Sequence, residues 1–207
     1  MKKDDMLNSV KSFLLHFGKI DEKVINAIEK IDRQDFMGIN KELAYEDKAI
    51  QIGHGQTISQ PSTVARMLSV LELKKSDEVL EIGAGSGWNA ALLGYLAKSV
   101  LTTEIVKELA ERAQKILRKL KIINVRVIRE DFRSQKKQFD RIIFTAGIFH
   151  DKKQEEIIKN FAKSNLKSDG ILICPHQHGP LIIYRKINSR LIKKFTDEEY
   201  IFVPLIL

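Results

Sequence analysis

The stretch Glu78-Val-Leu-Glu-Ile-Gly-Ala-Gly-Ser-Gly-Trp88 decides the fold of this chain. Its apolar first half predicts a strand, and three glycines follow at alternate positions, Gly83, Gly85 and Gly87. Glycine at a strand-to-helix turn lets the backbone approach a ligand, because no Cβ stands in the way. Open α/β sheets bind their ligands at the carboxyl ends of the strands. The stretch therefore predicts a strand, a ligand-binding loop and a helix that follows it.

The sequence after this turn predicts an α/β fold. Strand candidates are the segments 78–82, 99–103, 124–129, 139–145 and 170–174, and helix candidates between them are 88–96, 105–120 and 154–165. This alternation predicts a mostly parallel central sheet with helices on both faces. The segments 181–187, 191–195 and 201–207 are expected to be antiparallel strands that close the sheet edge.

The sequence before the turn is predicted to be largely helical. Apolar residues at helical spacing predict helices over 6–17, 22–31 and 62–71, and Asp21 is the expected N-cap of the second. Residues 32–60 are rich in turn formers and are expected to be irregular. Ser59 is expected to cap the third helix, which Pro61 opens.

Length and composition indicate one soluble domain. The chain has 207 residues, a formal net charge of +8 and a single cysteine. No apolar run approaches the roughly 20 residues that span a bilayer, and the charged N-terminus does not resemble a secretory signal. A lone cysteine excludes an internal disulfide and fits a reducing, cytoplasmic compartment. Basic side chains are spread among glutamates along predicted helical faces, so we expect neither a nucleic-acid partner nor a membrane partner.

The spacing of the glycines bears on the kind of cofactor. A nicotinamide-binding turn would have G-x-G-x-x-G, but its last position is Trp88 here. The pattern G-x-G-x-G is instead typical of S-adenosylmethionine-dependent methyltransferases. Glu104, at the end of the next strand, can accept hydrogen bonds from both ribose hydroxyls, and Asp131 follows the third strand. Glu81 lies within the apolar strand and needs a partner such as a backbone amide or the charged end of the ligand.

The second distinctive segment is Ile52-Gly-His-Gly-Gln-Thr-Ile-Ser-Gln-Pro61. Its pattern predicts only a loop followed by a helix N-terminus. No G-x-S-x-G motif surrounds Ser59, so a role as nucleophile is not indicated.

Several segments in order along the chain resemble the protein-L-isoaspartate O-methyltransferase family. They are Leu43-Ala-Tyr-Glu-Asp-Lys, Gly53-His-Gly-Gln-Thr-Ile-Ser-Gln-Pro, Val64-Ala-Arg-Met, the glycine loop, Phe139-Asp-Arg-Ile-Ile-Phe-Thr-Ala and Phe202-Val-Pro-Leu. The segment from Gly53 is specific to that family, whereas the glycine loop is common to methyltransferases. The resemblance implies a Rossmann-like class I methyltransferase fold with a seven-stranded sheet. It divides the single domain 1–207 into N-terminal helices with a covering loop, 1–77, and a Rossmann-like core, 78–207.

The resemblance also implies an activity and a set of site residues. The activity is methyl transfer from S-adenosyl-L-methionine to the α-carboxyl of L-isoaspartyl residues in damaged proteins and peptides, by a monomeric enzyme without a metal. Ser59 is implied as the active-site serine beside the transferred methyl. The implied cofactor-binding residues are Gln56, Thr57, Ile58, Glu81, Gly83, Ala84, Gly85, Glu104, Ile105, Asp131 and Phe132.

Such a reaction asks for little acid–base catalysis. An α-carboxyl has an ordinary pKa of about 3.5, so the isoaspartyl carboxylate is ionised at neutral pH and can attack a sulfonium methyl directly. Ser59 is therefore expected to orient the carboxylate by a hydrogen bond. The methyl ester would then close to a succinimide, and repeated cycles would repair the residue.

Four places depart from the usual family pattern. They are Ser62, the run Glu130-Asp131-Phe132, the run Gly147-Ile-Phe-His-Asp151, and Cys174-Pro-His-Gln-His-Gly-Pro180. Phe132 is expected near the adenine. Cys174 is expected to be buried in a strand, and His176 and His178 are expected in a surface loop because no third metal ligand is evident.

These departures keep two alternatives open. One is a methyltransferase for another small-molecule or macromolecular substrate, although the Asn/Asp-Pro-Pro-aromatic motif of base amino-methylation is absent after the fourth strand. The other is a catalytically idle homologue that binds the cofactor.

Overall fold

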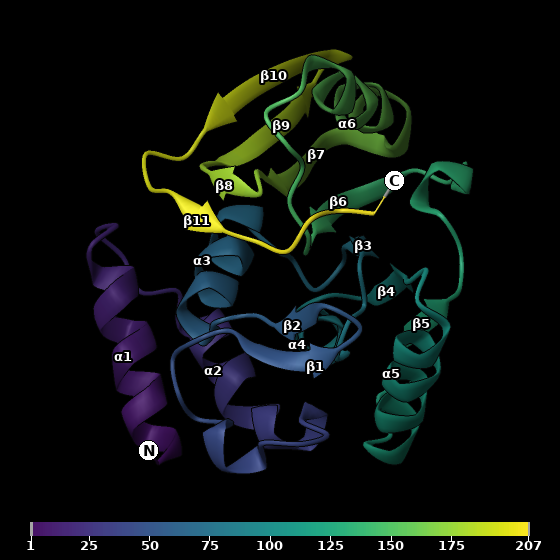
Figure 1. Cartoon of the computed structure of the whole chain (residues 1–207). Coiled ribbons are helices and arrows are strands. Elements are labelled where there is room, and N and C mark those ends of the chain that lie inside the picture. The colour runs from purple at the N-terminus through teal and green to yellow at the C-terminus, as the bar shows by residue number, and fades with distance from the viewer. Residues whose placement is uncertain (1, 207) are drawn as a thin grey trace.

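The central sheet of the molecule has seven strands (Figure 1). The structure, a computed structural model, describes residues 2–206. The strand order is β10-β9-β7-β6-β3-β4-β5. The parallel strands are β3 (Glu78–Ile82), β4 (Ser99–Thr103), β5 (Val125–Ile128), β6 (Phe139–Phe144) and β7 (Leu166–Pro175). The antiparallel strands β9 (Leu181–Ile187) and β10 (Arg190–Phe195) complete the sheet beyond β7. The parallel strands confirm the prediction from the alternating segments, and the seven-stranded Rossmann-like architecture is the one that the family resemblance implied.

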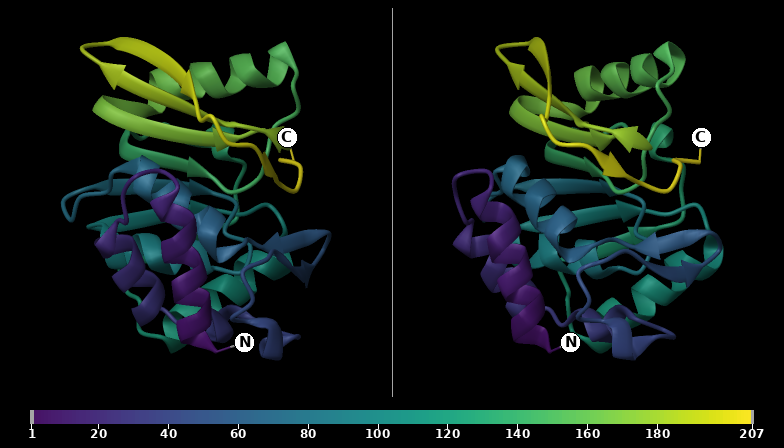
Figure 2. Two further views of the ribbon diagram at one scale, coloured as in Figure 1. Left: turned by 90° about the vertical axis from the view of Figure 1, so that its left-hand side faces the viewer. Right: turned by 60° about the vertical axis from the view of Figure 1, so that its left-hand side comes forward.

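Helices cover both faces of the sheet, as Figure 2 shows from two sides. Residues from α1 (Lys3–Leu15), α2 (Glu22–Lys30), α3 (Pro61–Leu71), α4 (Trp88–Leu96) and α5 (Lys107–Lys119) pack into one hydrophobic cluster. A second cluster contains the buried face of α6 (Lys152–Asn165). Successive strand residues alternate between the clusters, so that Ile143 belongs to the first and Ile142 and Phe144 to the second. The two clusters therefore sandwich the sheet.

Helix ends follow the expected local chemistry in one case and not in another. The Asp21 carboxylate accepts a hydrogen bond from Lys23 N–H, which confirms the predicted cap of α2. The prediction that Ser59 caps α3 is wrong. The cap residue of α3 is Gln60, without a side-chain hydrogen bond, and the Ser62 N–H instead donates to Asp47 Oδ1 at 2.9 Å.

The segment expected to be irregular contains two short 3₁₀ helices and a hairpin. Arg33–Phe36 and Lys41–Leu43 are the 3₁₀ helices, and β1 (Ile50–Gly53) pairs antiparallel with β2 (Gln56–Ile58). The turn of this hairpin has positive φ at Gly53, His54 and Gly55. The hairpin brings residues 56–58 over the carboxyl end of the sheet (Figure 1), where they line a pocket.

The C-terminal segment differs from its prediction. Residues 201–207 were expected to form a strand of the sheet, but only Tyr200–Ile201 (β11) is a strand, and it pairs with His178–Gly179 (β8) in a separate two-stranded sheet. Residues 202–206 then run across the carboxyl edge of the main sheet, and Leu207 lies outside the described residues. We call residues 202–206 the C-terminal strap.

Residues 2–206 contain neither a membrane-spanning helix nor a cluster of metal-binding side chains. No helix there is both long and apolar enough to cross a bilayer. No group of three or more histidine, cysteine, aspartate or glutamate side chains there could hold a metal ion.

Candidate functional site

A pocket lies at the carboxyl ends of β3, β4 and β6, where the glycine loop begins α4. Its wall comes from five segments of the chain: the hairpin with Ser59, α3, the glycine loop with the start of α4, the ends of the next strands, and the C-terminal strap. Of the predicted site residues, those that line it are Gln56, Thr57, Ile58, Ser59, Gly83, Ala84, Gly85, Glu104, Ile105, Asp131 and Phe132. Glu81 is the one predicted site residue that is not in the wall.

The glycine loop needs glycine at its first position for two reasons. Gly83 has φ +95°, and a Cβ there would lie 2.4 Å from Thr145 Oγ1. Thr145 Oγ1 donates to the Gly83 carbonyl at 2.6 Å, and the amides of Gly83 and Ala84 donate to Thr103 O. The loop is thus tied to both neighbouring strands, and its backbone forms the floor of the pocket.

Glu104 is held by backbone amides rather than by a cation. Its Oε2 accepts from Gly85 N–H at 2.9 Å, and its Oε1 accepts from Ile105 and Val106 at 2.9 and 3.0 Å. The residue is 7% exposed, at the pocket wall. A carboxylate has about four acceptor positions, so this one retains capacity for a ligand.

Glu81 acts on the pocket through a neighbour. It is fully buried, and its Oε1 accepts from Asn89 Nδ2 at 2.8 Å, while Oε2 has no partner. Asn89 itself lines the pocket. Burial, opposed by the hydrogen bond from Asn89, raises the pKa of Glu81 to about 8. The strand therefore contains a carboxyl group that is protonated at neutral pH.

Asp131 and Phe132 behave differently from each other. The Asp131 carboxylate caps the 3₁₀ helix Phe132–Ser134 by accepting from Arg133 N–H at 2.8 Å, and it also pairs with the Arg133 guanidinium, which lowers the pKa of Asp131. Phe132 is 3% exposed, and its ring packs edge-on against Phe144 and Phe161 at 5.0 Å. The ring expected near an adenine is thus mainly part of the core on the α6 side.

Ser59 lies where two pockets meet. A second pocket adjoins the first and is lined by Phe13, Gln60, Thr63, residues 178–179 and residues 198–203, among others. Thr57, Ser59, Thr145, Phe202 and Val203 line both pockets. The serine therefore lies in the shared wall between the pocket over the glycine loop and the second pocket.

The C-terminal strap is a part of the site that the sequence did not predict. Gly147 N–H donates to Val203 O and Leu205 N–H donates to Gly147 O, both at 2.8 Å. Residues 202–206 line the first pocket. The apolar residues and Pro204 of this segment suggested a strand, and its attachment to a loop 56 positions earlier leaves no local signal.

A buried arginine behind Ser59 was also not predicted. Arg33 is 1% exposed, and its guanidinium donates to carbonyl oxygens on both sides of the hairpin, including Ser59 O at 3.0 Å. Burial lowers the pKa of Arg33 to about 10. Its sequence neighbours, Asp32 and Gln34, indicate an ordinary surface turn, because the carbonyl partners are distant in sequence.

The histidines near the cleft correct one expectation. His178 is exposed, as expected for a surface loop, but His176 is 2% exposed. Its ring stacks on His150 with centroids 4.0 Å apart, and burial, with the nearby His150, lowers the pKa of His176. Cys174 is fully buried in β7, which confirms the expectation for it, and burial raises the pKa of its thiol.

Comparison with known proteins agrees with this geometry. Residues 3–207 match the family model described as Protein-L-isoaspartate(D-aspartate) O-methyltransferase. A protein-L-isoaspartate O-methyltransferase of Bradyrhizobium sp. (strain ORS 278) is 40% identical over 198 residues, which is 91% of this chain and 88% of that protein. One of Aliivibrio fischeri (strain ATCC 700601 / ES114) is 36% identical over 211 residues, 97% of this chain and 98% of the other.

A solved structure shows that the fold is shared. It is a putative protein-L-isoaspartate O-methyltransferase from Plasmodium falciparum in complex with S-adenosyl-L-homocysteine, with a TM-score of 0.80 at 23% identity over 100% of this chain and 99% of that one. At 23% identity this structure shows only that the fold is shared. The family is shown by the family model and by the relatives that are 36–40% identical. From residue 3 onward, therefore, the chain belongs to the protein-L-isoaspartate O-methyltransferase family.

Proposed function

We propose that this protein transfers a methyl group from S-adenosyl-L-methionine to the α-carboxyl of L-isoaspartyl residues in damaged proteins and peptides. One observation carries the proposal beyond family membership. Ser59 lies in the wall shared by the pocket over the glycine loop and the second pocket. A methyl donor in the first and a carboxylate in the second would meet at this serine.

The residues of the first pocket fit an S-adenosylmethionine molecule. Gly83 and Gly85 have positive φ and carry no side chain, so a ligand can lie directly against their backbone. Glu104 supplies acceptor oxygens at the wall, as a ribose diol requires, and Glu81 Oε1 holds the side chain of Asn89, which lines the pocket. The wall also contains Ile58, Val64, Met67 and Ile105, which suits the apolar part of the ligand. When bound, this ligand supplies a methyl group on a positively charged sulfur.

We assign the predicted residues accordingly. Gly83, Ala84 and Gly85 would hold the methionine end, with Glu81 acting through Asn89. Glu104 would accept from the ribose hydroxyls, with Ile105 beside them. Asp131 and the Phe132 backbone would meet the adenine. Gln56, Thr57 and Ile58 would close over the ligand from the hairpin.

Ser59 is the proposed catalytic residue. Its hydroxyl would donate a hydrogen bond to the incoming carboxylate and orient one of the carboxylate oxygens toward the methyl carbon. No proton transfer is required, because the carboxylate is already ionised at neutral pH. Opposite charges cancel as the bond forms, so exclusion of water by the hairpin and the C-terminal strap favours the step. Alignment of oxygen, carbon and sulfur can supply several kcal/mol of rate acceleration.

The pockets and the single cysteine also bear on the oligomeric state and the location of the protein. We propose that the chain works as a monomer, since one chain lines both pockets. We propose a reducing, cytoplasmic location, since the one cysteine is buried. Residues 1–77 would cover the ligands, and residues 78–207 would bind the cofactor within one domain.

The test is methyl transfer from labelled S-adenosylmethionine to an isoaspartyl peptide and to its aspartyl twin. We expect label in the isoaspartyl peptide alone, and a Ser59→Ala variant should lower kcat. Ser164→Ala, an exposed serine on α6, is the matched control. Cofactor binding without transfer would identify an idle homologue, and transfer to neither peptide but to another acceptor would identify a different substrate.

A further inference from the structure

Arg33 is the most deeply buried cation of the described chain, and its contacts are unusual. Nη1 donates to the carbonyl oxygens of Ala44 and Glu46 at 2.8 and 3.2 Å. Nη2 donates to Lys48 O at 2.9 Å, and to Ile58 O and Ser59 O at 3.4 and 3.0 Å. The side chain thus joins residues 44–48, which precede the hairpin, to residues 58–59, where the hairpin ends.

No carboxylate among residues 2–206 forms an ion pair with this guanidinium. Asp47 acts on it only as a nearby charge, and the ring of Trp88 lies 5.4 Å from its central carbon. A buried charge without a counter-ion is costly, so it persists only where its hydrogen bonds are good. Here backbone carbonyls supply them, and the pKa of about 10 keeps the group charged at neutral pH.

The 44–48 stretch in turn holds the other side of Ser59. Asp47 Oδ1 accepts from Ser62 N–H at 2.9 Å, and Asp47 Oδ2 accepts from Ser9 Oγ at 3.0 Å. The short run 59–62 is therefore fixed at both ends. Its first carbonyl is bound by Arg33, and its last amide is bound by a segment that Arg33 also holds.

We propose that Arg33 is a positioning residue for methyl transfer, which fixes the backbone of Ser59 so that the serine hydroxyl faces the point where the two pockets meet. This rests on the proposed function of Ser59. Arg33 touches neither pocket, so it acts through the main chain alone. The planar fork of arginine can bind both stretches together, whereas the single ammonium of lysine cannot.

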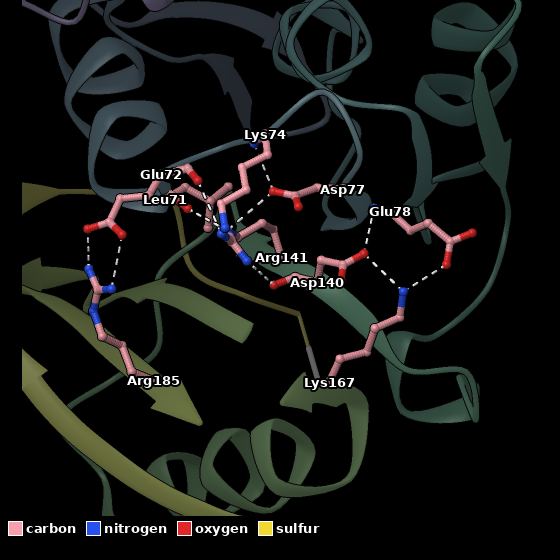
Figure 3. A network of polar contacts seen from close by, with 9 residues as sticks. All are labelled: Leu71, Glu72, Lys74, Asp77, Glu78, Asp140, Arg141, Lys167 and Arg185. Atoms are coloured by element: carbon pink, nitrogen blue, oxygen red, sulfur yellow. Dashed lines mark hydrogen bonds and ion pairs between the residues drawn. The ribbon is translucent and has the colours of Figure 1, made fainter. Parts of the chain in front are cut away.

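Arg141 provides a matched control at the opposite edge of the sheet. It is 5% exposed, and it donates to the carbonyl oxygens of Leu71 and Asp140 at 2.8 Å and of Glu72 at 3.1 Å (Figure 3). It lines neither pocket. Replacing either arginine by lysine keeps the charge and removes part of a carbonyl-binding fork, but only one replacement involves Ser59.

The experiment compares Arg33→Lys, Arg141→Lys, Ser59→Ala and the double variant Arg33→Lys/Ser59→Ala. We expect Arg33→Lys to lower kcat by at least about tenfold, since small misplacements near reacting groups have large effects on rate. The affinity for S-adenosylhomocysteine should stay within about threefold, and Arg141→Lys should keep kcat within about twofold. The double variant should be no slower than Ser59→Ala alone, because Arg33 acts only through the serine.

A second readout does not depend on activity. Amide hydrogen exchange in peptides that cover residues 56–64 should accelerate in Arg33→Lys and not in Arg141→Lys. Failure of the wild-type protein to methylate isoaspartyl peptides would contradict the proposed function, and exchange would still test the positioning. The inference would be overturned if amide exchange or kcat were unchanged in Arg33→Lys. It would also be overturned if the reductions in kcat caused by Arg33→Lys and Ser59→Ala multiplied in the double variant.

If Arg33→Lys does not fold, Arg33→Gln takes its place. If neither variant folds while Arg141→Lys does, Arg33 stabilises the whole fold rather than positioning Ser59, and the inference is again overturned.

Discussion

Charged side chains pair with one another at the amino edge of the central sheet, whereas Glu81 and Glu104 at its carboxyl edge have no cationic partner among the described residues. At the amino edge, Lys167 Nζ bonds both Glu78 Oε2 at 3.0 Å and Asp140 Oδ2 at 2.9 Å, and Arg141 lies 3.5 Å from Asp77 (Figure 3). Glu72 pairs there with Arg185. At the carboxyl edge, Glu104 is bonded only to backbone amides, and one oxygen of Glu81 has no partner.

The charged groups of the amino edge therefore stabilise the fold, whereas those of the carboxyl edge can bind a ligand. Charges that are bonded to each other contribute to the native state and have little capacity left for a ligand. A carboxylate held by amides is oriented without being neutralised, and it remains available to a ligand. The amino edge joins α3, β3, β6 and β7, and the carboxyl edge is where we place the reaction. The predictions below test this separation.

The largest effect is expected from Arg141→Met. The variant leaves the carbonyl oxygens of Leu71 and Glu72 without their side-chain donor and the buried carboxylate of Asp77 without its cationic partner, so the free energy of unfolding should fall by about 3–5 kcal/mol. Urea denaturation measures this loss. Methyl transfer under conditions where the variant is folded should keep its kcat, and a tenfold fall in kcat would show that the two edges are not separate.

Removal of the Glu104 side chain should act on binding instead. We expect Glu104→Ala to weaken S-adenosylhomocysteine binding by about a hundredfold, because a charge-assisted hydrogen bond to the ligand contributes about 1.5–3 kcal/mol and the amides of Gly85, Ile105 and Val106 lose the acceptor that orients them. Isothermal titration calorimetry gives the dissociation constant. Asp140→Ala, a carboxylate lost from the amino edge, should leave it within about threefold. A loss of less than tenfold in Glu104→Ala would argue against the ribose assignment.

The buried Glu81 should make stability fall with rising pH. Its folded-state pKa of about 8 exceeds its ordinary value of 4.5, so the folded protein binds more protons between those values. The contribution is fully present below pH 4.5 and is lost as pH rises through 8. Wild type should lose on the order of 2 kcal/mol between pH 6 and 9, which Glu81→Gln should not lose.

Thermal unfolding at both pH values measures this difference. Glu156→Gln, which replaces an exposed carboxylate on α6, is the control and should follow wild type. Parallel curves for wild type and Glu81→Gln would mean that Glu81 is already ionised at pH 6.

The smallest effect is expected from Lys167→Met. Its ammonium pairs with Glu78 and Asp140, but the three side chains are 26–36% exposed. Pairs of this kind contribute about 0–1 kcal/mol each, so the loss should be about 1 kcal/mol in low salt and less in 1 M salt. Cofactor affinity should be unchanged, and a measurable change in it would connect the two edges.

The sequence predicted best where local signals agree with tertiary structure. The bounds of β3, β4, α4 and β9 match their predictions. The apolar runs of β3 and β9 end at Gly83 and at the turn residues Asn188-Ser189, and α4 begins directly after Gly87. The predicted residues on the glycine loop and on the strand ends line the first pocket, and each was recognisable because it follows a predicted strand.

The rest depended on contacts between distant residues. The hairpin strands are only 4 and 3 residues long, which is too short for a periodic pattern. The apolar C-terminal strap resembles a strand until its bonds to Gly147 are seen. Arg33 resembles a surface residue because all five of its partners are backbone carbonyl oxygens 11–26 positions away.

Because Cys174 is buried, chemical modification of its thiol reports the unfolding of the chain. This is the only thiol among the 207 residues, it lies in β7, and its raised pKa keeps it as the unreactive protonated form. A thiol reagent should therefore modify the folded protein only when β7 opens, with no engineered label. The modification rate should fall when S-adenosylhomocysteine is added, since a ligand that binds only the folded state stabilises it by mass action.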